Sequence, residues 1–425
     1  MALLAAALLP LLNRPTRPAA PPLASAPPVD RTAPPATHAP PPTEPTTLVA
    51  PDDPLEPATL NDLLDLPRRD LHRVDIARLN LLAASALPAT ADLDVEHALR
   101  TLDRWAQQVA DATDRHLYRL ADPRFADRYQ GSEPHLRAEL LAQVLVEDLG
   151  VKYDPTALGN FSFQDPAVAF IHGMIPTALQ QLGHGTADTP GGTCASMPVL
   201  YVAVGRRLGY PLYLATTDSH VFARWDGTTS APTGQAHPNP AWQERFNCET
   251  TNGFTRIDDD AHYLSFPFPV SDEQARANRY LESLTPRAEL ALFLAARGHH
   301  ALDNQQRAFA ARCYENAASY DPTRPAYAAW FLQAASGTDY RPQSRRLAAM
   351  LPPPGAPFAA SPSAHLPRRY ALDDDVRRLQ QPTYLRSTVN APALHQSRAN
   401  PLEPIPAAPY IPNDVIRPPI PGASP

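Results

Sequence analysis

Two residues of this chain combine the chemistry and the spacing of a catalytic pair, Cys194 and His220. Cys194 ends the run Gly191–Cys194 and begins an apolar segment, whereas His220 begins the alternating segment His220–Trp225. A thiolate is a strong nucleophile, and an imidazole can take up its proton and return it to a leaving group. A cysteine at a helix start with a histidine on a later strand therefore predicts nucleophilic catalysis.

A helix is predicted to begin close to Cys194. Thr193 can cap it, apolar residues recur at helical spacing from Met197 to Leu208, and Gly209 ends the run. Pro198 limits the start, because proline lacks an N–H group and is tolerated only in the first turn. The sulfur of Cys194 is thus expected within about one turn of the helix N-terminus. The helix dipole there favours the thiolate form.

Three strands are predicted to follow, at 212–215, 220–225 and 244–249. If the last two form an antiparallel hairpin in which Trp225 opposes Glu244, then five residues further along each strand His220 opposes Glu249. Paired residues project to the same face of a sheet, so Glu249 could orient the imidazole and stabilise its charged form. Asn247 lies on the same face and is the alternative for this third role.

Four motifs carry a family resemblance: Gly192-Thr193-Cys194-Ala195-Ser196, Arg206-Arg207-Leu208-Gly209-Tyr210-Pro211, His220-x-Phe222-x-Arg224-Trp225 and Phe246-Asn247-x-Glu249. Together they resemble the bacterial transglutaminase-like superfamily, and within it the SirB-type proteins. The resemblance implies a papain-like core with Cys194 as nucleophile, His220 as general base and Glu249 as the orienting residue. The family usually has an Asp-Pro pair at the third position, where this chain has Glu249 and Thr250.

The resemblance implies a thiol acyl-transfer enzyme that acts on amide bonds of a protein or peptide substrate, as a peptidase, deamidase or transglutaminase. The alternative is a non-catalytic module that binds peptides or proteins with the same fold. Each residue also has a structural interpretation, because cysteine is often a buried, inert hydrophobe and histidine is often a satisfied strand residue. Cys248 and Cys313 are interpreted as structural.

No cofactor or metal site is expected. The chain contains no Cys-x-x-Cys pair and no His-Glu-x-x-His motif, and His299 and His300 are adjacent instead of sharing one helix face. The net charge is −7, no basic run is present, and Lys152 is the single lysine, so nucleic-acid binding and self-crosslinking are not expected.

The fold class is predicted to be α+β, with five segments along the chain. Two of them, 1–54 and 351–425, are rich in proline and are expected to be largely disordered. A helical region at 55–160 is expected to pack on a transglutaminase-like core at 161–270. Its helices are predicted from the apolar stripe of 94–120 and from the start signal Ser132-Glu133-Pro134, with an end at Gly150.

The segment 271–350 is predicted to be helical, and 286–322 resembles one tetratricopeptide repeat. Gly298, Ala310, Tyr314, Ala317 and Pro322 fall at the spacing of the small, aromatic and terminating positions of that repeat. A single repeat cannot bury its own apolar face, so it is expected to dock on the core or on a following helix. The region 286–335 is either a peptide-binding surface or a helical hairpin that closes the core.

The first twelve residues, Met1 to Leu12, are mostly alanine and leucine and are too short to span a bilayer. No basic residue precedes them, unlike in a secretory signal. Three cysteines in 425 residues are too few for a disulfide framework, and this low number is typical of proteins in a reducing compartment. A cytoplasmic location is therefore expected, with export by an atypical N-terminal signal as the alternative.

Overall fold

The computed structural model describes residues 53–154, 157, 162–183, 191–251 and 257–351. The segments 1–54 and 351–425, which were predicted to be disordered, lie outside these ranges except for residues 53, 54 and 351. The helices are α1 (Leu60–Asp65), α2 (Ile76–Ala84), α3 (Val95–His116), α4 (Ala126–Tyr129), α5 (Glu133–Gln143), α6 (Pro176–Gln181), α7 (Met197–Arg207), α8 (Asp260–Tyr263), α9 (Asp272–Asn278), α10 (Pro286–Asp303), α11 (Arg307–Tyr320), α12 (Pro325–Ala335) and α13 (Arg345–Ala348). The strands are β1 (Leu212–Thr217), β2 (His220–Asp226), β3 (Arg245–Cys248) and β4 (Ile257–Asp258).

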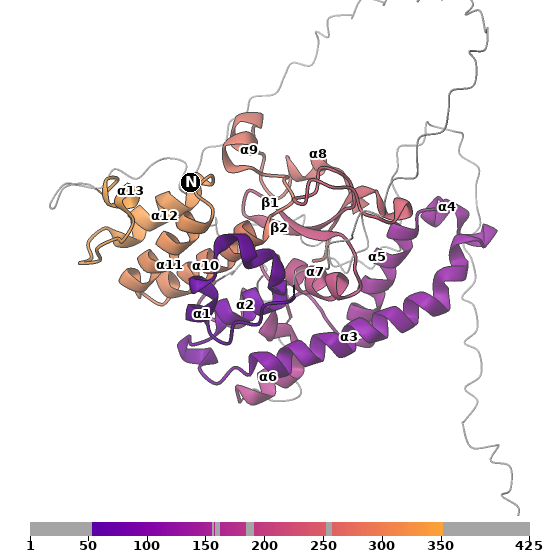
Figure 1. Cartoon of the computed structure of the whole chain (residues 1–425), viewed down its shortest axis with the longest axis horizontal. Coiled ribbons are helices and arrows are strands. Elements are labelled where there is room, and N and C mark those ends of the chain that lie inside the picture. The colour runs from indigo at the N-terminus through magenta and orange to yellow at the C-terminus, as the bar shows by residue number, and fades with distance from the viewer. Residues whose placement is uncertain (1–52, 155–156, 158–161, 184–190, 252–256, 352–425) are drawn as a thin grey trace, which may run out of the picture. The chain divides into compact units, whose positions relative to one another are not determined.

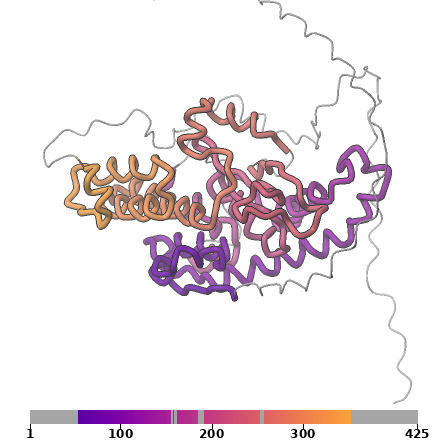
Figure 2. Tube along the Cα trace, turned by 45° about the horizontal axis from the view of Figure 1, so that its top comes forward, coloured from indigo at the N-terminus to yellow at the C-terminus, as the bar shows by residue number. Residues whose placement is uncertain are grey.

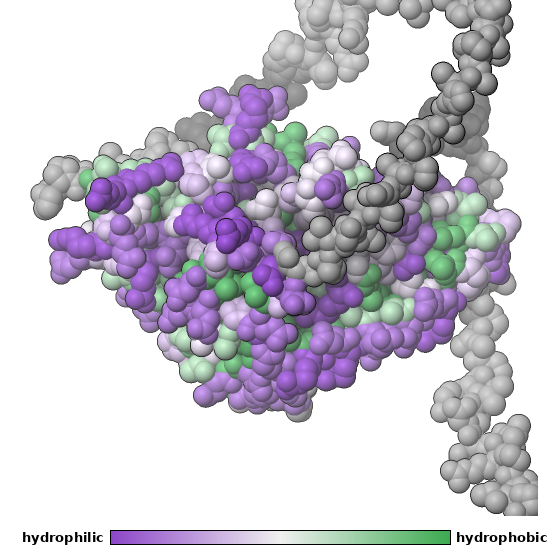
Figure 3. Space-filling model, viewed as in Figure 1, coloured by the Kyte–Doolittle hydropathy of each residue, from purple (hydrophilic) through white to green (hydrophobic). Residues whose placement is uncertain are grey.

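The predicted N-terminal helices are confirmed, with one correction at an end. The long helix α3 buries the predicted stripe and packs against α7 and α5 (Figure 1). It ends at His116, where a 3₁₀ turn changes the periodicity, so Leu117 is 36% exposed instead of buried. In Figure 3, apolar side chains gather at this far end of the helix, next to α4.

Helix α5 begins where its start signal predicts. The Ser132 hydroxyl accepts a hydrogen bond from the His135 N–H, and Pro134 occupies the first turn. The chain then continues as one π-helical turn, Val144–Asp148, and Gly150 ends it at a φ of +70°. A positive φ suits glycine because it has no Cβ atom.

The four strands form one antiparallel sheet in the order β1-β2-β3-β4. A two-residue turn joins β1 to β2, and Ser219 in this turn has a φ of +60°. A positive φ at the second of the two turn residues is the requirement of a type II turn. The turn places His220 at the first position of β2, opposite Thr217 of β1.

The predicted register between β2 and β3 is wrong by two residues. Trp225 pairs with Phe246, not with Glu244, so Glu249 does not lie directly opposite His220 and follows the end of β3. The intervening segment contains a short 3₁₀ helix, Pro240–Trp242, which the sequence pattern does not show. Because side chains alternate with a period of two, a shift of two residues leaves every side chain on its predicted face.

The sheet has a layer on each face. Helix α7 packs against β1 and β2, on the side where Ala223 and Trp225 join the main hydrophobic core. On the other side, Phe222 forms a smaller buried cluster with Ala215 of β1 and Tyr263 of α8. The α+β class is therefore confirmed, and the core draws residues from all three predicted segments between 55 and 350.

The helices α10, α11 and α12 lie next to one another in chain order, as Figure 2 shows. Gly298 of α10 faces the Tyr314 ring of α11, where a Cβ atom would lie 2.5 Å from the ring, so only glycine permits this approach. Helix α10 also packs on α2, and the Arg297 guanidinium donates to the Ala83 and Ser85 carbonyls, each at 2.7 Å. The hairpin thus docks both on the N-terminal helices and on a following helix.

Helix α10 is also tied to α7 by an ion pair. The Arg206 guanidinium donates to both carboxylate oxygens of Glu289, at 2.6 and 3.1 Å, and the Glu289 side chain is fully buried.

Within the described ranges, no helix combines the length and the apolarity that crossing a membrane requires.

Candidate active site

Cys194 lies in a tight turn directly before α7. The helix begins at Met197 and not at Cys194, and the Met197 N–H makes the first helical hydrogen bond, 2.9 Å long, to the Thr193 carbonyl. Thr193 was predicted to cap the helix, but the N-cap residue is Ser196, which makes no side-chain capping bond. The Thr193 hydroxyl instead accepts a hydrogen bond from the Ala195 N–H at 3.1 Å and donates one to the Val168 carbonyl at 2.8 Å, within the turn that precedes the helix. These bonds fix the turn that presents Cys194 at the helix N-terminus.

A short parallel bridge fixes the glycines that precede this turn. The Gly192 N–H donates to the Lys152 carbonyl, and its carbonyl accepts from the Asp154 N–H, both at 2.8 Å. A Cβ atom on Gly191 would lie 2.5 Å from the Asp154 nitrogen, which is closer than a carbon can approach. The close contact with the backbone of 152–154 thus explains why glycine occupies position 191.

The structure brings His220 and Glu249 into direct contact. The distance from His220 Nε2 to Glu249 Oε2 is 2.8 Å, and the exposed fractions of the two residues are 5% and 2%. The imidazole also makes a hydrogen bond with Cys194, which is 8% exposed. Because Nε2 is engaged by Glu249, Nδ1 is the ring nitrogen available to the thiol. The imidazole therefore lies between the sulfur and the carboxylate.

The electrostatics of the pair favour a charged imidazole. Burial acts against the charge, yet the Glu249 carboxylate and the hydrogen bond with Cys194 together raise the pKa of His220 above its ordinary value of 6.5. Burial also acts to raise the pKa of Glu249, but the His220 charge and the hydrogen bonds from Thr251 lower it below 4.5. An imidazolium next to a cysteine stabilises the thiolate.

Two partners of Glu249 were not predicted from the sequence. Its Oε1 atom accepts hydrogen bonds from the Thr251 N–H at 3.0 Å and from the Thr251 hydroxyl at 2.6 Å. Its Oε2 atom accepts one from the Tyr263 hydroxyl at 3.2 Å, in addition to the bond with His220. A threonine two residues after an acidic residue is a local signal that could have been recognised, but nothing local points to Tyr263.

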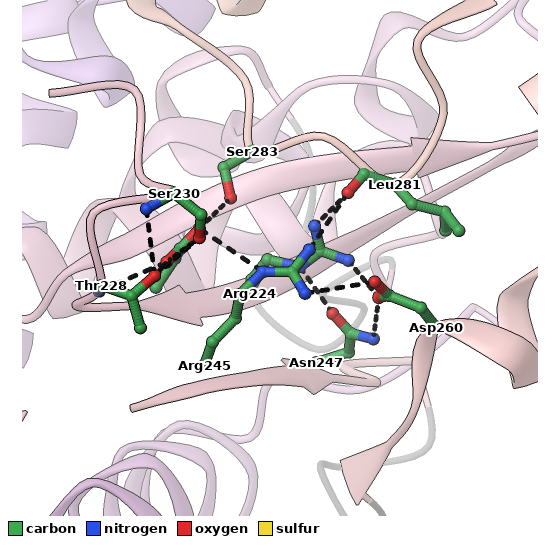
Figure 4. Close-up of polar contacts among 9 residues, drawn as sticks. Arg224, Thr228, Ser230, Arg245, Asn247, Asp260, Leu281 and Ser283 are labelled. Carbon is green, nitrogen blue, oxygen red and sulfur yellow. Dashed lines mark hydrogen bonds and ion pairs between the residues drawn. The ribbon is translucent and has the colours of Figure 1, made fainter. Parts of the chain in front are cut away.

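Asn247, the alternative for the third role, contacts a different set of residues. Its Oδ1 atom accepts from Arg224 Nε at 2.7 Å, and its Nδ2 atom donates to Asp260 Oδ1 at 2.9 Å (Figure 4). The Arg224 side chain is fully buried, and Asp260 begins α8. Asn247 therefore connects β3 to α8, whereas Glu249 is the residue in contact with His220.

The other two cysteines, Cys248 and Cys313, are buried. Burial raises the pKa of the Cys248 thiol, and it raises the pKa of Cys313 to about 11, so both remain protonated at neutral pH. No disulfide links the three cysteines, which is consistent with their separate roles.

The described ranges contain no group of three or more His, Cys, Asp and Glu side chains that could hold a metal ion. Residues 184–190, which come shortly before Cys194 in the chain, lie outside these ranges. Comparisons with protein-family models, with curated proteins and with solved structures find no match to this chain.

Proposed function

We propose that this protein is a cysteine-dependent acyl-transfer enzyme that acts on amide bonds of a protein or peptide. The proposal depends on one observation, that the buried His220 ring contacts Glu249 at 2.8 Å and also forms a hydrogen bond with Cys194. This is the order of nucleophile, base and orienting residue in a thiol triad. The order of α7, β1, β2 and β3 supports a papain-like core of the transglutaminase-like type.

The reaction follows from the charge state of the site. The Cys194 thiolate attacks the carbonyl carbon of the amide, and the carbonyl oxygen becomes an oxyanion. The His220 imidazolium then donates its proton to the nitrogen, the C–N bond breaks, and the amine leaves. Water or a second amine attacks the thioester and gives its proton to His220, the C–S bond breaks, and the Cys194 thiolate leaves. Glu249 stays ionised and stabilises the imidazolium in both half-reactions.

The oxyanion requires N–H donors near the sulfur. The Ala195 and Ser196 N–H groups already donate within the turn, to the Thr193 hydroxyl at 3.1 Å and to its carbonyl at 3.1 Å. We propose the N–H of Cys194, at the helix start beside the sulfur, as the donor to the oxyanion. Attack by an amine makes the enzyme a transglutaminase. Attack by water makes it a peptidase when the substrate is a backbone amide and a deamidase when it is a side-chain amide.

Alkylation of Cys194 by iodoacetamide across pH tests the proposal. We expect the wild type to react near neutral pH faster than a model thiol, because the imidazolium maintains the thiolate. Cys194→Ala should abolish this fast labelling and His220→Ala should slow it, whereas the control Cys313→Ala should leave it unchanged. A rate equal to that of a model thiol, with no change in His220→Ala, would refute the enzyme hypothesis.

A non-catalytic peptide-binding module is the second candidate. The observation that favours it is the low exposure of the site, at 8% for Cys194 and 5% for His220. In this hypothesis the helices of 286–335 bind a peptide partner. A thiol-reactive amide-mimic probe separates the two, because the module would be labelled equally in the wild type and in Cys194→Ala.

A further inference from the structure

Tyr263 lies behind the candidate triad and shares a hydrogen-bond acceptor with it. The tyrosine is the last residue of α8 and is fully buried. Its hydroxyl donates to Glu249 Oε2 at 3.2 Å, and this is the oxygen that His220 Nε2 contacts at 2.8 Å. Burial and the nearby carboxylate raise the pKa of Tyr263 well above 10, so the hydroxyl keeps its proton and acts as a donor.

The ring of Tyr263 is held by two neighbouring rings. It stacks on Phe222 with a centroid distance of 3.8 Å and an interplanar angle of 12°, and it lies nearly parallel to the His220 ring at 6.0 Å. The Thr217 hydroxyl donates to the Tyr263 carbonyl at 2.7 Å. Because the ring and the backbone are both fixed, the hydroxyl points to one place, the Oε2 atom of Glu249.

The helix that carries Tyr263 is itself anchored. Asp260, at its start, accepts hydrogen bonds from Arg224 at 2.5 Å, from Asn247 at 2.9 Å and from Arg245 at 3.2 Å (Figure 4). Arg224 and Asn247 come from β2 and β3, the strands that position His220 and Glu249. The network in Figure 4 therefore fixes α8 relative to the two strands that build the site.

We propose that Tyr263 is a positioning residue, which keeps the Glu249 carboxylate aimed at the Nε2 atom of His220. Thr251 holds Oε1 and Tyr263 holds Oε2, so the carboxylate cannot rotate away from the imidazole. Without the Tyr263 hydroxyl, Oε2 has one partner left and the carboxylate can turn about the bonds to Thr251. The inference rests on the proposed function, in which an ionised Glu249 stabilises the His220 imidazolium.

The other titratable groups around the pair do not substitute for this hydroxyl. Cys194 makes a hydrogen bond with the imidazole of His220 and not with the Glu249 carboxylate that Tyr263 holds. Burial raises the pKa values of the tyrosine and cysteine side chains that face Glu249, which keeps them neutral. They are Tyr153, Tyr201 and Cys248. His262 of α8 packs edge-on against the Tyr263 ring at 5.1 Å and forms an ion pair with Asp258 at 3.8 Å.

The test is Tyr263→Phe, which removes the hydroxyl and keeps the ring. The matched control is Tyr314→Phe, because that tyrosine is also fully buried and bonds a histidine, His299, at 2.8 Å. The direct readout is the pKa of His220 from ¹⁵N-histidine NMR, assigned with His220→Gln. The second readout is the upper pH limit of fast Cys194 alkylation, which reports the loss of the imidazolium proton.

We expect Tyr263→Phe to lower the pKa of His220 by about one unit, a tenfold change in the protonation equilibrium. The alkylation limit should fall with it, and Tyr314→Phe should change neither value. Should Tyr263→Phe fail to fold, Asp260→Asn tests the same claim through the anchor of α8, with a smaller decrease expected. An unchanged pKa of His220 in a folded variant would overturn the inference. Failure of the proposed function is a separate result, since it would appear as slow alkylation in the wild type.

Discussion

Replacement of Glu249 by glutamine should disable the site through the tautomer of His220. The carboxylate accepts four hydrogen bonds, two on Oε1 from Thr251 and two on Oε2 from His220 and Tyr263. A glutamine amide has a single acceptor oxygen. Of the four donors, only the Thr251 N–H cannot reverse its role, because hydroxyl groups can rotate and imidazole can change its tautomer.

The amide oxygen of Glu249→Gln should therefore face Thr251, which leaves the NH₂ group facing His220 Nε2. The imidazole must then accept at Nε2 and carry its proton on Nδ1, the nitrogen that faces the thiol. Such an imidazole cannot take a proton from Cys194. A triad with the wrong histidine tautomer loses about 10⁴-fold in turnover. Loss of the ion pair between Glu249 and His220 should also lower the free energy of unfolding.

The assay is the alkylation rate of Cys194 from about pH 5, the lower end of the ordinary histidine range, to above the raised pKa of His220 of about 10, together with unfolding by denaturant. Glu315→Gln is the matched control, because Glu315 is also buried and accepts a hydroxyl bond from Tyr340 and an N–H bond from Ser344, both at 2.6 Å. We expect the control to lose stability without any change in the alkylation profile. A folded Glu249→Gln variant that keeps the wild-type profile would refute the reasoning.

Three further predictions concern stability. The raised pKa of His220 stabilises the fold fully below its unfolded value of 6.5, and this contribution is lost as the pH rises through the folded value. The unfolding free energy of the wild type, relative to His220→Gln, should thus fall above pH 6.5 by up to about 1.4 kcal/mol per pH unit, and a flat difference would contradict this. Glu289→Ala should lower the free energy of unfolding by about 3 kcal/mol, because it leaves the Arg206 charge without its partner. Glu282→Ala removes an exposed ion pair and should lower it by under about 1 kcal/mol. Equal losses would show that burial is not the cause. Gly191→Ala should lower the free energy of unfolding by about 1–3 kcal/mol, since the added Cβ atom would clash with the backbone of 152–154. Unchanged stability would mean that this backbone moves aside without cost.

Much of the fold was predictable because it follows from local patterns. The helical period predicted α3, α5 and α7 to within a few residues, the Ser132 start signal predicted the beginning of α5, and the period of two predicted β2 and β3. The errors occurred at ends and in connections. Helix α7 begins three residues later than Cys194, and the segment between β2 and β3 folds into a short 3₁₀ helix that shifts the register.

The contact between His220 and Glu249 survived a wrong register for a physical reason. A shift of two residues changes which residues are directly opposite but not which face they occupy. The long glutamate side chain then reaches His220 diagonally, past the end of β3, to within 2.8 Å. Asn247 shares that face, but its amide oxygen accepts a hydrogen bond from the buried Arg224.

The sequence by itself determined the types of side chain, the approximate course of the main helices and the face of each strand, because these depend on residues a few positions apart. The tertiary structure decided which groups complete the site. Tyr263, the Arg224 network and the bridge from Tyr153 to Gly192 join segments that are far apart in the chain. Such contacts depend on how whole elements pack, and no spacing along one segment encodes them.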